Sequence, residues 1–297
     1  MAGASGFLGS LLRRQLADDG HEIVQLVRRE PDRPEQRRWW PERRQLDPAL
    51  LARADAVVNL AGAGVEDKRW NDSYRAALRS SRLGPTETLA TALAAQPAEQ
   101  RPRILLNSSA VGFYGDTGDT AVDESSLPGQ GFFPDLCRAW EAATGPAQGA
   151  GVRVVRLRTG FPLDAGGGLL KPLLLPFRLG VGGRLGNGRQ WMPVMSVHDW
   201  LSAVGFLLAR EDIAGPVNMV GPSPVRNADF TKALGRALHR PAITVVPKLA
   251  LRVLIGEFAN EAVASQRVLP GVLTASGFAY RHADVDSALR AGLSGAA

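Results

Sequence analysis

The chain has 297 residues, of which 45% are hydrophobic and 22% charged, and its formal net charge at pH 7 is +6. This composition is that of a globular protein with one large core or two linked lobes. The single cysteine, Cys137, excludes an intramolecular disulfide. The longest apolar stretches are interrupted by Lys, Arg and Pro, and no leader is visible, so we expect no membrane partner and a cytoplasmic location.

A glycine-spaced segment opens the chain, with Gly3, Gly6 and Gly9 at the spacing of a phosphate-binding loop. Glycine allows the backbone to approach a pyrophosphate closely. Leucines at helical spacing follow, and Gly20 is placed to end that helix. The N-terminus of such a helix attracts phosphate through its free N–H groups and its dipole. The segment therefore predicts dinucleotide binding, although the buried strand that usually precedes such a loop is missing.

A strand is predicted over residues 21–27, and it ends in the basic pair Arg28-Arg29. At this position an acidic residue binds the ribose of NAD, whereas an arginine accommodates the 2′-phosphate of NADP. Arg28 or Arg29 therefore favours NADP, the alternative being the solvated start of a loop. The basic residues that follow are diluted by acidic ones, so we expect no nucleic-acid partner and expect Trp39 and Trp40 to cover the adenine side of the sheet.

Strands and helices alternate along the rest of the chain. We expect strands over 55–60, 103–107, 152–157 and 217–220, and helices over 71–95, 134–144 and 228–238. Gly84-Pro85 is expected to kink or restart the first of these helices. The alternation predicts an α/β fold with a doubly wound parallel sheet, the Rossmann arrangement.

Polar residues stand at the carboxyl end of the strand predicted over 103–107. Ser109 there would bond a substrate oxygen or simply cap the strand end. The histidines show no metal-ligand spacing, so we expect them to be structural and expect no metal site; they are His21, His198, His239 and His282.

Ordered motifs along the whole chain carry a family resemblance. They include Asn59-Leu60-Ala61-Gly62, Ser81-Arg82, the segment from Ser109 to Asp116, the segment from Cys137 to Glu141, Gly188-Arg189-Gln190-Trp191 and the segment from Gln266 to Pro270. The chain resembles atypical extended short-chain dehydrogenases/reductases, the "epimerase family protein" group. The resemblance implies an NADP-binding Rossmann domain over 1–160, joined by 191–240, and a smaller substrate lobe made of 161–190 and 241–297, which includes the group's C-terminal domain.

The resemblance also bears on the chain start and the cofactor. Relatives carry an apolar strand before the glycine loop, so we expect a truncated start, with weaker NADP binding and lower stability than in a form extended upstream. The residues that would contact NADP are Gly3, Gly6, Phe7, Leu8 and Gly9 at the pyrophosphate, Val27 and Arg28 at the 2′-phosphate, and Leu60, Ala61 and Arg82 beside the cofactor.

The family's usual catalytic pair is absent. Typical members carry a Tyr, which transfers the proton, and a Lys four residues later, which lowers the pKa of that Tyr. If Glu141 is the usual glutamate of that helix, these positions hold Phe133 and Cys137. The serine position falls on Ala110, or on Ser109 after one insertion. Ser109, Tyr114 and Cys137 remain the catalytic candidates, with buried, inert thiol as the alternative for Cys137.

We expect an NADP(H)-dependent oxidoreductase or epimerase-like enzyme acting on an unidentified small molecule. The alternative is a non-catalytic NADP(H)-binding redox sensor or interaction protein. In the substrate lobe, Arg178, Arg184 and Arg189 would meet an anionic substrate or solvate a loop.

Overall fold

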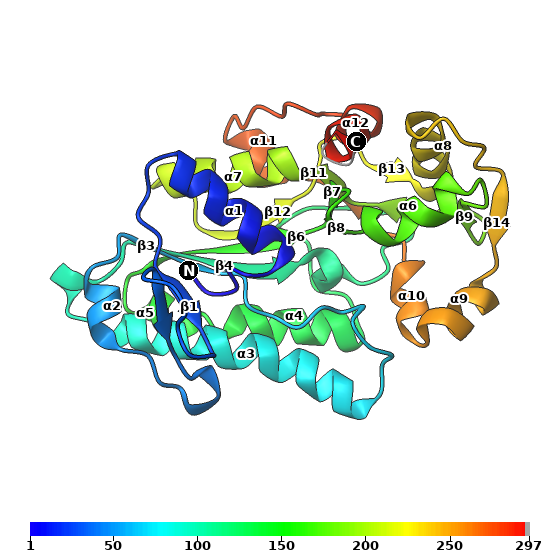
Figure 1. Ribbon diagram of the computed structural model, residues 1–297. Helices are drawn as coiled ribbons and strands as arrows, with labels where there is room; N and C mark the ends of the chain where they lie inside the picture. The colour runs from blue at the N-terminus through cyan, green and yellow to red at the C-terminus, as the bar shows by residue number, and fades with distance from the viewer. Residues whose placement is uncertain (295–297) are drawn as a thin grey trace.

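The computed structural model describes residues 1–294, with the side chains of residues 248, 252, 254, 255, 260 and 262 left aside. A parallel sheet forms its centre (Figure 1), in the order β2–β1–β3–β4–β6–β12, with Ala2 bridging β1 to β3. The strands are β1 (Gln25–Val27), β2 (Gln36–Arg38), β3 (Ala56–Asn59), β4 (Ile104–Ala110), β6 (Arg153–Thr159) and β12 (Gly215–Met219). The predicted α/β fold with a parallel sheet is confirmed.

Met1 and Ala2 hold the position between β1 and β3 where the sequence offers no full strand. The Ala2 N–H donates to the Val58 carbonyl at 2.8 Å, and the Leu60 N–H donates to the Ala2 carbonyl at 3.0 Å. On the other side, the Leu26 N–H donates to the Met1 carbonyl at 2.8 Å. These bonds place Gly3 at the carboxyl edge of the sheet, where the strand order reverses and where open α/β sheets bind ligands.

Helices cover both faces of this sheet (Figure 1). One face carries α1 (Phe7–Asp18), α7 (Val197–Ala209) and α11 (Gly271–Ala275), and the other carries α3 (Asp72–Ala95), α4 (Phe132–Ala142) and α5 (Gly145–Gly149). In β4, Leu106 packs among the residues of the first face, and Leu105 packs among those of the second. A strand covered on both faces must be apolar throughout its length, which explains its Ile-Leu-Leu run.

Two helix predictions have different outcomes. α1 ends as expected, because Gly20 adopts a φ of +87° and its N–H donates to the Ala17 carbonyl. The restart expected at Gly84-Pro85 is wrong, since α3 runs through both residues. The Thr86 and Thr88 hydroxyls donate to the carbonyls of Arg82 and Gly84 in the preceding turn of α3, each at 2.8 Å.

A smaller lobe stands at one end of the sheet. Its strands include β7 (Phe161–Asp164), β9 (Gly183–Leu185), β11 (Val194–Ser196) and β14 (Thr244–Val246), and its helices include α6 (Leu170–Arg178), α8 (Asn227–Ala237), α9 (Lys248–Ile255), α10 (Phe258–Ala262) and α12 (Val285–Leu293). The core of this lobe contains Leu163, Leu170, Phe177, Phe230, Leu234 and Leu289. Phe230 and Leu234 show that part of the joining segment 191–240 packs with this lobe.

The remaining elements are short. They are α2 (Pro48–Ala52), β5 (Ala121–Val122), β8 (Gly167–Gly168), β10 (Trp191–Met192), β13 (Val225–Arg226) and β15 (Arg267–Val268), with 3-10 turns at Pro41–Arg43, Ala98–Gln100 and Val111–Tyr114. Within residues 1–294, no helix combines the length and the apolar character that crossing a bilayer requires.

Candidate functional site

The glycine loop packs directly on the end of β3. Gly3 adopts a φ of +74°, and a Cβ at this residue would lie 2.5 Å from the carbonyl carbon and oxygen of Leu60. A Cβ at Gly9 would lie 2.0 Å from the Gly3 carbonyl oxygen. Both contacts are too close for any side chain, so the structure itself requires glycine at Gly3 and Gly9. The predicted group Gly3, Gly9, Leu60 and Ala61 is thus brought together.

The first turn of α1 leaves donors available at this loop. Gly6 is the N-cap and supplies no side chain, and its own N–H donates to the Gly3 carbonyl. No acceptor within residues 1–294 takes the N–H groups of Phe7, Leu8 and Gly9. These are the orphan donors of a helix N-terminus, and they form an anion cradle at the carboxyl edge of the sheet. The Phe7 ring itself packs beside Gly167, where a Cβ would lie 2.3 Å from it.

The end of β1 carries several cations in different circumstances. Val27 is the last residue of β1, and Arg28 follows it with an exposed side chain. Arg29 pairs with Asp32 at 2.6 Å, whereas Arg38 pairs with Glu30 and lies over the Trp40 ring. Arg28 has no such partner within the described residues, so its charge is available where β1 ends.

The two tryptophans next to these cations, Trp39 and Trp40, have different surroundings. Trp39 is 2% exposed and packs with Ala2, Val57 and Leu89 in the core between the sheet and α3. Trp40 is half-buried beneath Arg38, with the guanidinium 5.0 Å from its ring centre. Trp39 therefore belongs to the fold itself, and the placement of adenine stays a prediction.

The turn after β3 is held by a buried polar cluster. The Asn59 amide donates to Asn107 at 2.7 Å and to Thr86 at 3.0 Å, while its oxygen accepts from the Ala61 N–H at 3.2 Å. Arg82 donates to the Ala63 carbonyl at 3.0 Å, and its guanidinium lies 5.2 Å from the Trp140 ring centre. Burial lowers the pKa of Arg82. Arg82 thus borders the loop 61–63 from the α3 side, and its contact with the cofactor stays a prediction.

A second buried network joins β4, α4, β6 and β12. The Ser109 hydroxyl donates to Glu141 at 2.7 Å, and Arg158 donates to both oxygens of the same carboxylate at 2.8 and 2.9 Å. Arg158 also donates to the Tyr114 hydroxyl at 2.9 Å, and that hydroxyl donates to Asn218 Oδ1 at 2.8 Å. The Arg158 guanidinium lies 3.5 Å from the centre of the Phe113 ring.

The surroundings within this buried network raise the pKa values of Arg158 and Tyr114. Burial by itself would lower the pKa of Arg158, but the hydrogen bonds and charge of Glu141 outweigh it and raise that pKa. Burial raises the pKa of Tyr114 to about 12 despite the neighbouring Arg158. Tyr114 therefore carries its proton at neutral pH, and that proton is directed at Asn218.

Several known proteins resemble this chain in sequence and in fold. The pattern of the "NAD dependent epimerase/dehydratase family" matches residues 1–132, and that of "Domain of unknown function (DUF1731)" matches residues 246–291. Over 290 residues the chain is 43% identical to "Epimerase family protein MT2273" of Mycobacterium tuberculosis (strain CDC 1551 / Oshkosh), covering 97% of this chain and 95% of the relative. The chain belongs to the epimerase family proteins.

Solved structures of this epimerase family agree with the fold. The human epimerase family protein SDR39U1 (isoform2), solved with NADPH, is 31% identical and has a TM-score of 0.87, covering 97% of this chain and 96% of that one. The nucleoside-diphosphate sugar epimerase from Corynebacterium glutamicum is 36% identical with a TM-score of 0.81, covering 98% of this chain and 57% of that one. The resemblance inferred from the motifs is confirmed.

In this epimerase-family chain, the positions assigned to the usual Tyr and Lys lie on α4 in apolar surroundings. The Phe133 ring packs against Trp70, with 5.0 Å between the ring centres. Cys137 is 1% exposed, and burial, assisted by the Glu141 carboxylate, raises the pKa of its thiol to about 12. A protonated, inaccessible thiol is not nucleophilic, so the geometry favours the inert alternative for Cys137.

The three catalytic candidates, Ser109, Tyr114 and Cys137, are all buried. Ser109 and Tyr114 are each 3% exposed, and both hydroxyl protons are directed to buried acceptors. The side chains of successive strand residues alternate between the two faces of the sheet. Ser109 points toward α4, where its hydroxyl donates to Glu141. Their roles in catalysis stay predictions.

The sequence reading missed Arg158 and Asn218. A signal for Arg158 was present, since it directly follows the buried strand predicted over 152–157 and a buried charge requires a partner. Asn218 carries no such signal: its link to Tyr114 joins residues 104 positions apart.

The remaining polar candidates lie away from this network. Arg178, Arg184 and Arg189 are exposed on the small lobe, and contact with an anionic substrate stays a prediction. His282 Nδ1 lies 3.0 Å from the Ser196 hydroxyl and 3.3 Å from Asp199, so one nitrogen serves both neighbours and no catalytic relay results. No cluster of metal-ligand residues occurs in the part of the chain that the structure describes.

Proposed function

We propose that the protein is an NADP(H)-dependent oxidoreductase or epimerase-like enzyme acting on a small molecule. The observation that carries the proposal is the anion cradle: a glycine loop without room for side chains, beside free N–H groups of α1. The family membership and the NADPH in the human relative's structure support it.

The residues fit the cofactor in the order that the sequence suggests. Phe7, Leu8 and Gly9 would hold the pyrophosphate through backbone N–H groups, with Gly3 and Gly6 giving access to it. Leu60, Ala61 and Arg82 border the same edge. When bound, the nicotinamide accepts or donates hydride.

The choice of NADP over NAD rests on the end of β1. Arg28 extends into solvent beside the loop, and Arg29 and Arg38 already have carboxylate partners. A guanidinium forms strong, charge-assisted hydrogen bonds with a phosphate group. We therefore propose Arg28, with Val27 beneath it, as the contact for the 2′-phosphate.

The proton step has to proceed without the usual Tyr and Lys. The Ser109 and Tyr114 hydroxyls keep their protons and donate to Glu141 and Asn218, and reorientation of the Tyr114 hydroxyl would leave the buried Asn218 oxygen unpaired. Of the proton sources compatible with the sequence, this arrangement favours a water molecule bound with the substrate. The same arrangement supports the alternative, a non-catalytic NADP(H)-binding redox sensor or interaction protein.

One experiment separates these functions. NADPH, NADP and NADH are titrated against the protein, and NADPH deuterated at the nicotinamide is then incubated with carbonyl compounds and sugar nucleotides. Tight NADPH binding with deuterium transfer to a product supports the enzyme. Tight binding with no transfer across the panel supports the sensor, which also requires a partner that distinguishes NADP from NADPH. Failure to bind any of the nucleotides contradicts both.

A further inference from the structure

Exposed large apolar side chains gather at the end of the molecule formed by α6, β9, β14 and α9 (Figure 1). Their exposed fractions run from 43% to 87%, which is unusual for leucine, isoleucine and valine in one region. We call this surface the apolar end face; its members are Leu175, Leu179, Val181, Ile243, Val245, Leu249 and Val253.

The parts of the apolar end face are joined to one another. The guanidinium of Arg240 donates to the Arg178 carbonyl at 3.0 Å, which connects the end of α6 to the segment before β14. A Cβ at Gly180 would lie 3.8 Å from the Pro241 ring, and β9 pairs with β14 in parallel. On α9, which follows β14 directly, the exposed residues Leu249 and Val253 are one helical turn apart.

The same segments are strongly basic. Residues 169–190 contain four Lys or Arg residues and no Asp or Glu, and residues 230–256 contain five and likewise no acidic residue. A surface that combines apolar side chains with cations matches the interface of an anionic bilayer, where acyl chains lie beneath negatively charged headgroups.

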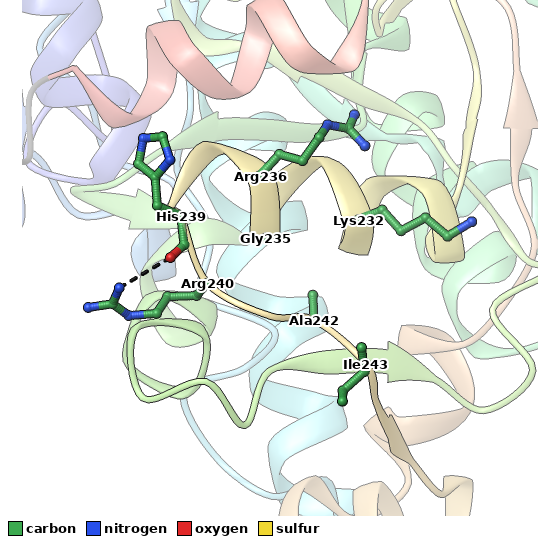
Figure 2. A pocket seen from close by; sticks show the side chains of 7 residues that line it. All are labelled: Lys232, Gly235, Arg236, His239, Arg240, Ala242 and Ile243. Atoms are coloured by element: carbon green, nitrogen blue, oxygen red, sulfur yellow. Dashed lines mark hydrogen bonds between the residues drawn. The ribbon is translucent and has the colours of Figure 1, made fainter.

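A hollow of about 690 Å³ adjoins this face beside the end of α8 (Figure 2). Its basic residues are Lys232, Arg236, His239 and Arg240, and its apolar residues include Ala242 and Ile243. Lys232 and Arg236 have carboxylate partners at 3.6 and 2.7 Å. Within residues 1–294, Arg240 donates only to carbonyl oxygens, so its charge is not balanced by a carboxylate.

We propose that the apolar end face docks on an anionic lipid bilayer, with Ile243 and its neighbours in the interface and a headgroup phosphate in the hollow beside Arg240. A second copy of this chain fits less well, because a symmetric contact would bring the cations of the two copies together. No membrane-crossing segment is required. The sequence reading excluded a membrane partner only because spans are absent, and docking at the surface involves no span.

Vesicle sedimentation tests the apolar part of this face. The full chain should sediment with vesicles of phosphatidylserine and phosphatidylcholine, and stay in solution with phosphatidylcholine alone. Ile243→Asp combined with Leu249→Asp should weaken binding at least tenfold, whereas Leu127→Asp should leave it unchanged. Leu127 is a matched control, being 86% exposed in the loop before α4. All these side chains are exposed, so melting curves should coincide with that of the original chain.

The charges are tested separately. Lys232→Gln with Arg240→Gln should weaken binding about fivefold for each cation removed, and added salt should reduce the difference. Arg103→Gln is the control, because its side chain is 85% exposed at the start of β4. Absence of binding to the anionic vesicles overturns the proposal. It is also overturned if the Ile243 and Leu249 variants convert a dimer to a monomer, or if binding falls equally with Leu127→Asp.

Discussion

The two sides of the sheet's carboxyl edge use their polar groups in opposite ways. At the glycine loop, the N–H groups of Phe7, Leu8 and Gly9 lack acceptors within the described chain, and Arg28 is unpaired there. Across β4, the hydroxyls of Ser109 and Tyr114 are committed to internal partners.

This difference indicates which part of the sheet's carboxyl edge is suited to bind a ligand. Unpaired donors at a protein edge are costly unless water or a ligand satisfies them, so their clustering marks a binding site. A fully paired buried network instead rigidifies the structure around it. The glycine loop is therefore prepared to hold a dinucleotide, while the hydroxyls across β4 are held by internal partners.

The largest expected effect comes from breaking the paired side. Arg158→Met leaves the Glu141 carboxylate buried without its partner, and should lower the free energy of unfolding by about 3–5 kcal/mol. Urea denaturation measures the change. Arg158→Met with Glu141→Leu should recover most of the loss, since neither charge then remains buried. A single variant as stable as the original chain would show that the network does not support the fold.

The next effect concerns the loop. Gly9→Ala places a Cβ 2.0 Å from the Gly3 carbonyl oxygen, and should cost about 1–3 kcal/mol of stability and abolish NADPH binding. Gly6→Ala is the matched control for stability, because its Cβ would meet nothing closer than 3.5 Å. Thermal melting and NADPH titration report on the two variants. Equal melting temperatures would mean that the loop is not packed as described.

A smaller effect distinguishes the cations at the end of β1. Arg28→Ala should weaken NADPH binding by about 10- to 100-fold, the range expected for losing hydrogen bonds to a charged group, and leave NADH binding unchanged. Arg29→Ala should change both affinities little, because that side chain is paired with Asp32. Calorimetric titration measures them. An equal loss in the Arg29 variant would place the phosphate elsewhere.

The last effect is a pH dependence on the paired side, which develops only above pH 9. The pKa of Cys137 rises from an ordinary 9.0 to about 12 in the folded chain, so at intermediate pH the unfolded chain releases a proton that the folded chain retains. The stability contributed by the neutral thiol is therefore present below pH 9 and declines between about pH 9 and pH 12.

Cys137→Ala tests this directly. The variant should lose less stability than the original chain as pH rises above 9, and thiol reagents should label the original chain only after unfolding. Rapid labelling of the folded chain at neutral pH would restore Cys137 as a reactive candidate.

Local pattern was enough for much of this protein. Alternating apolar strands and amphipathic helices indicated the parallel sheet, because each pattern has a period that only one element satisfies. The glycine spacing indicated the phosphate-binding loop, since close backbone approach is a property of short segments, and the role of Arg28 stays a prediction. The motifs also indicated the epimerase family, which the relatives confirm.

Other features depended on contacts between distant residues. The environment of Tyr114 was decided by Arg158 and Asn218, which lie 44 and 104 positions away in the chain. The glycine spacing alone was enough to indicate where the backbone packs too closely for side chains. Only the tertiary structure decided which hydroxyls and thiols are accessible, because burial and hydrogen-bond partners arise from packing between segments far apart in the chain.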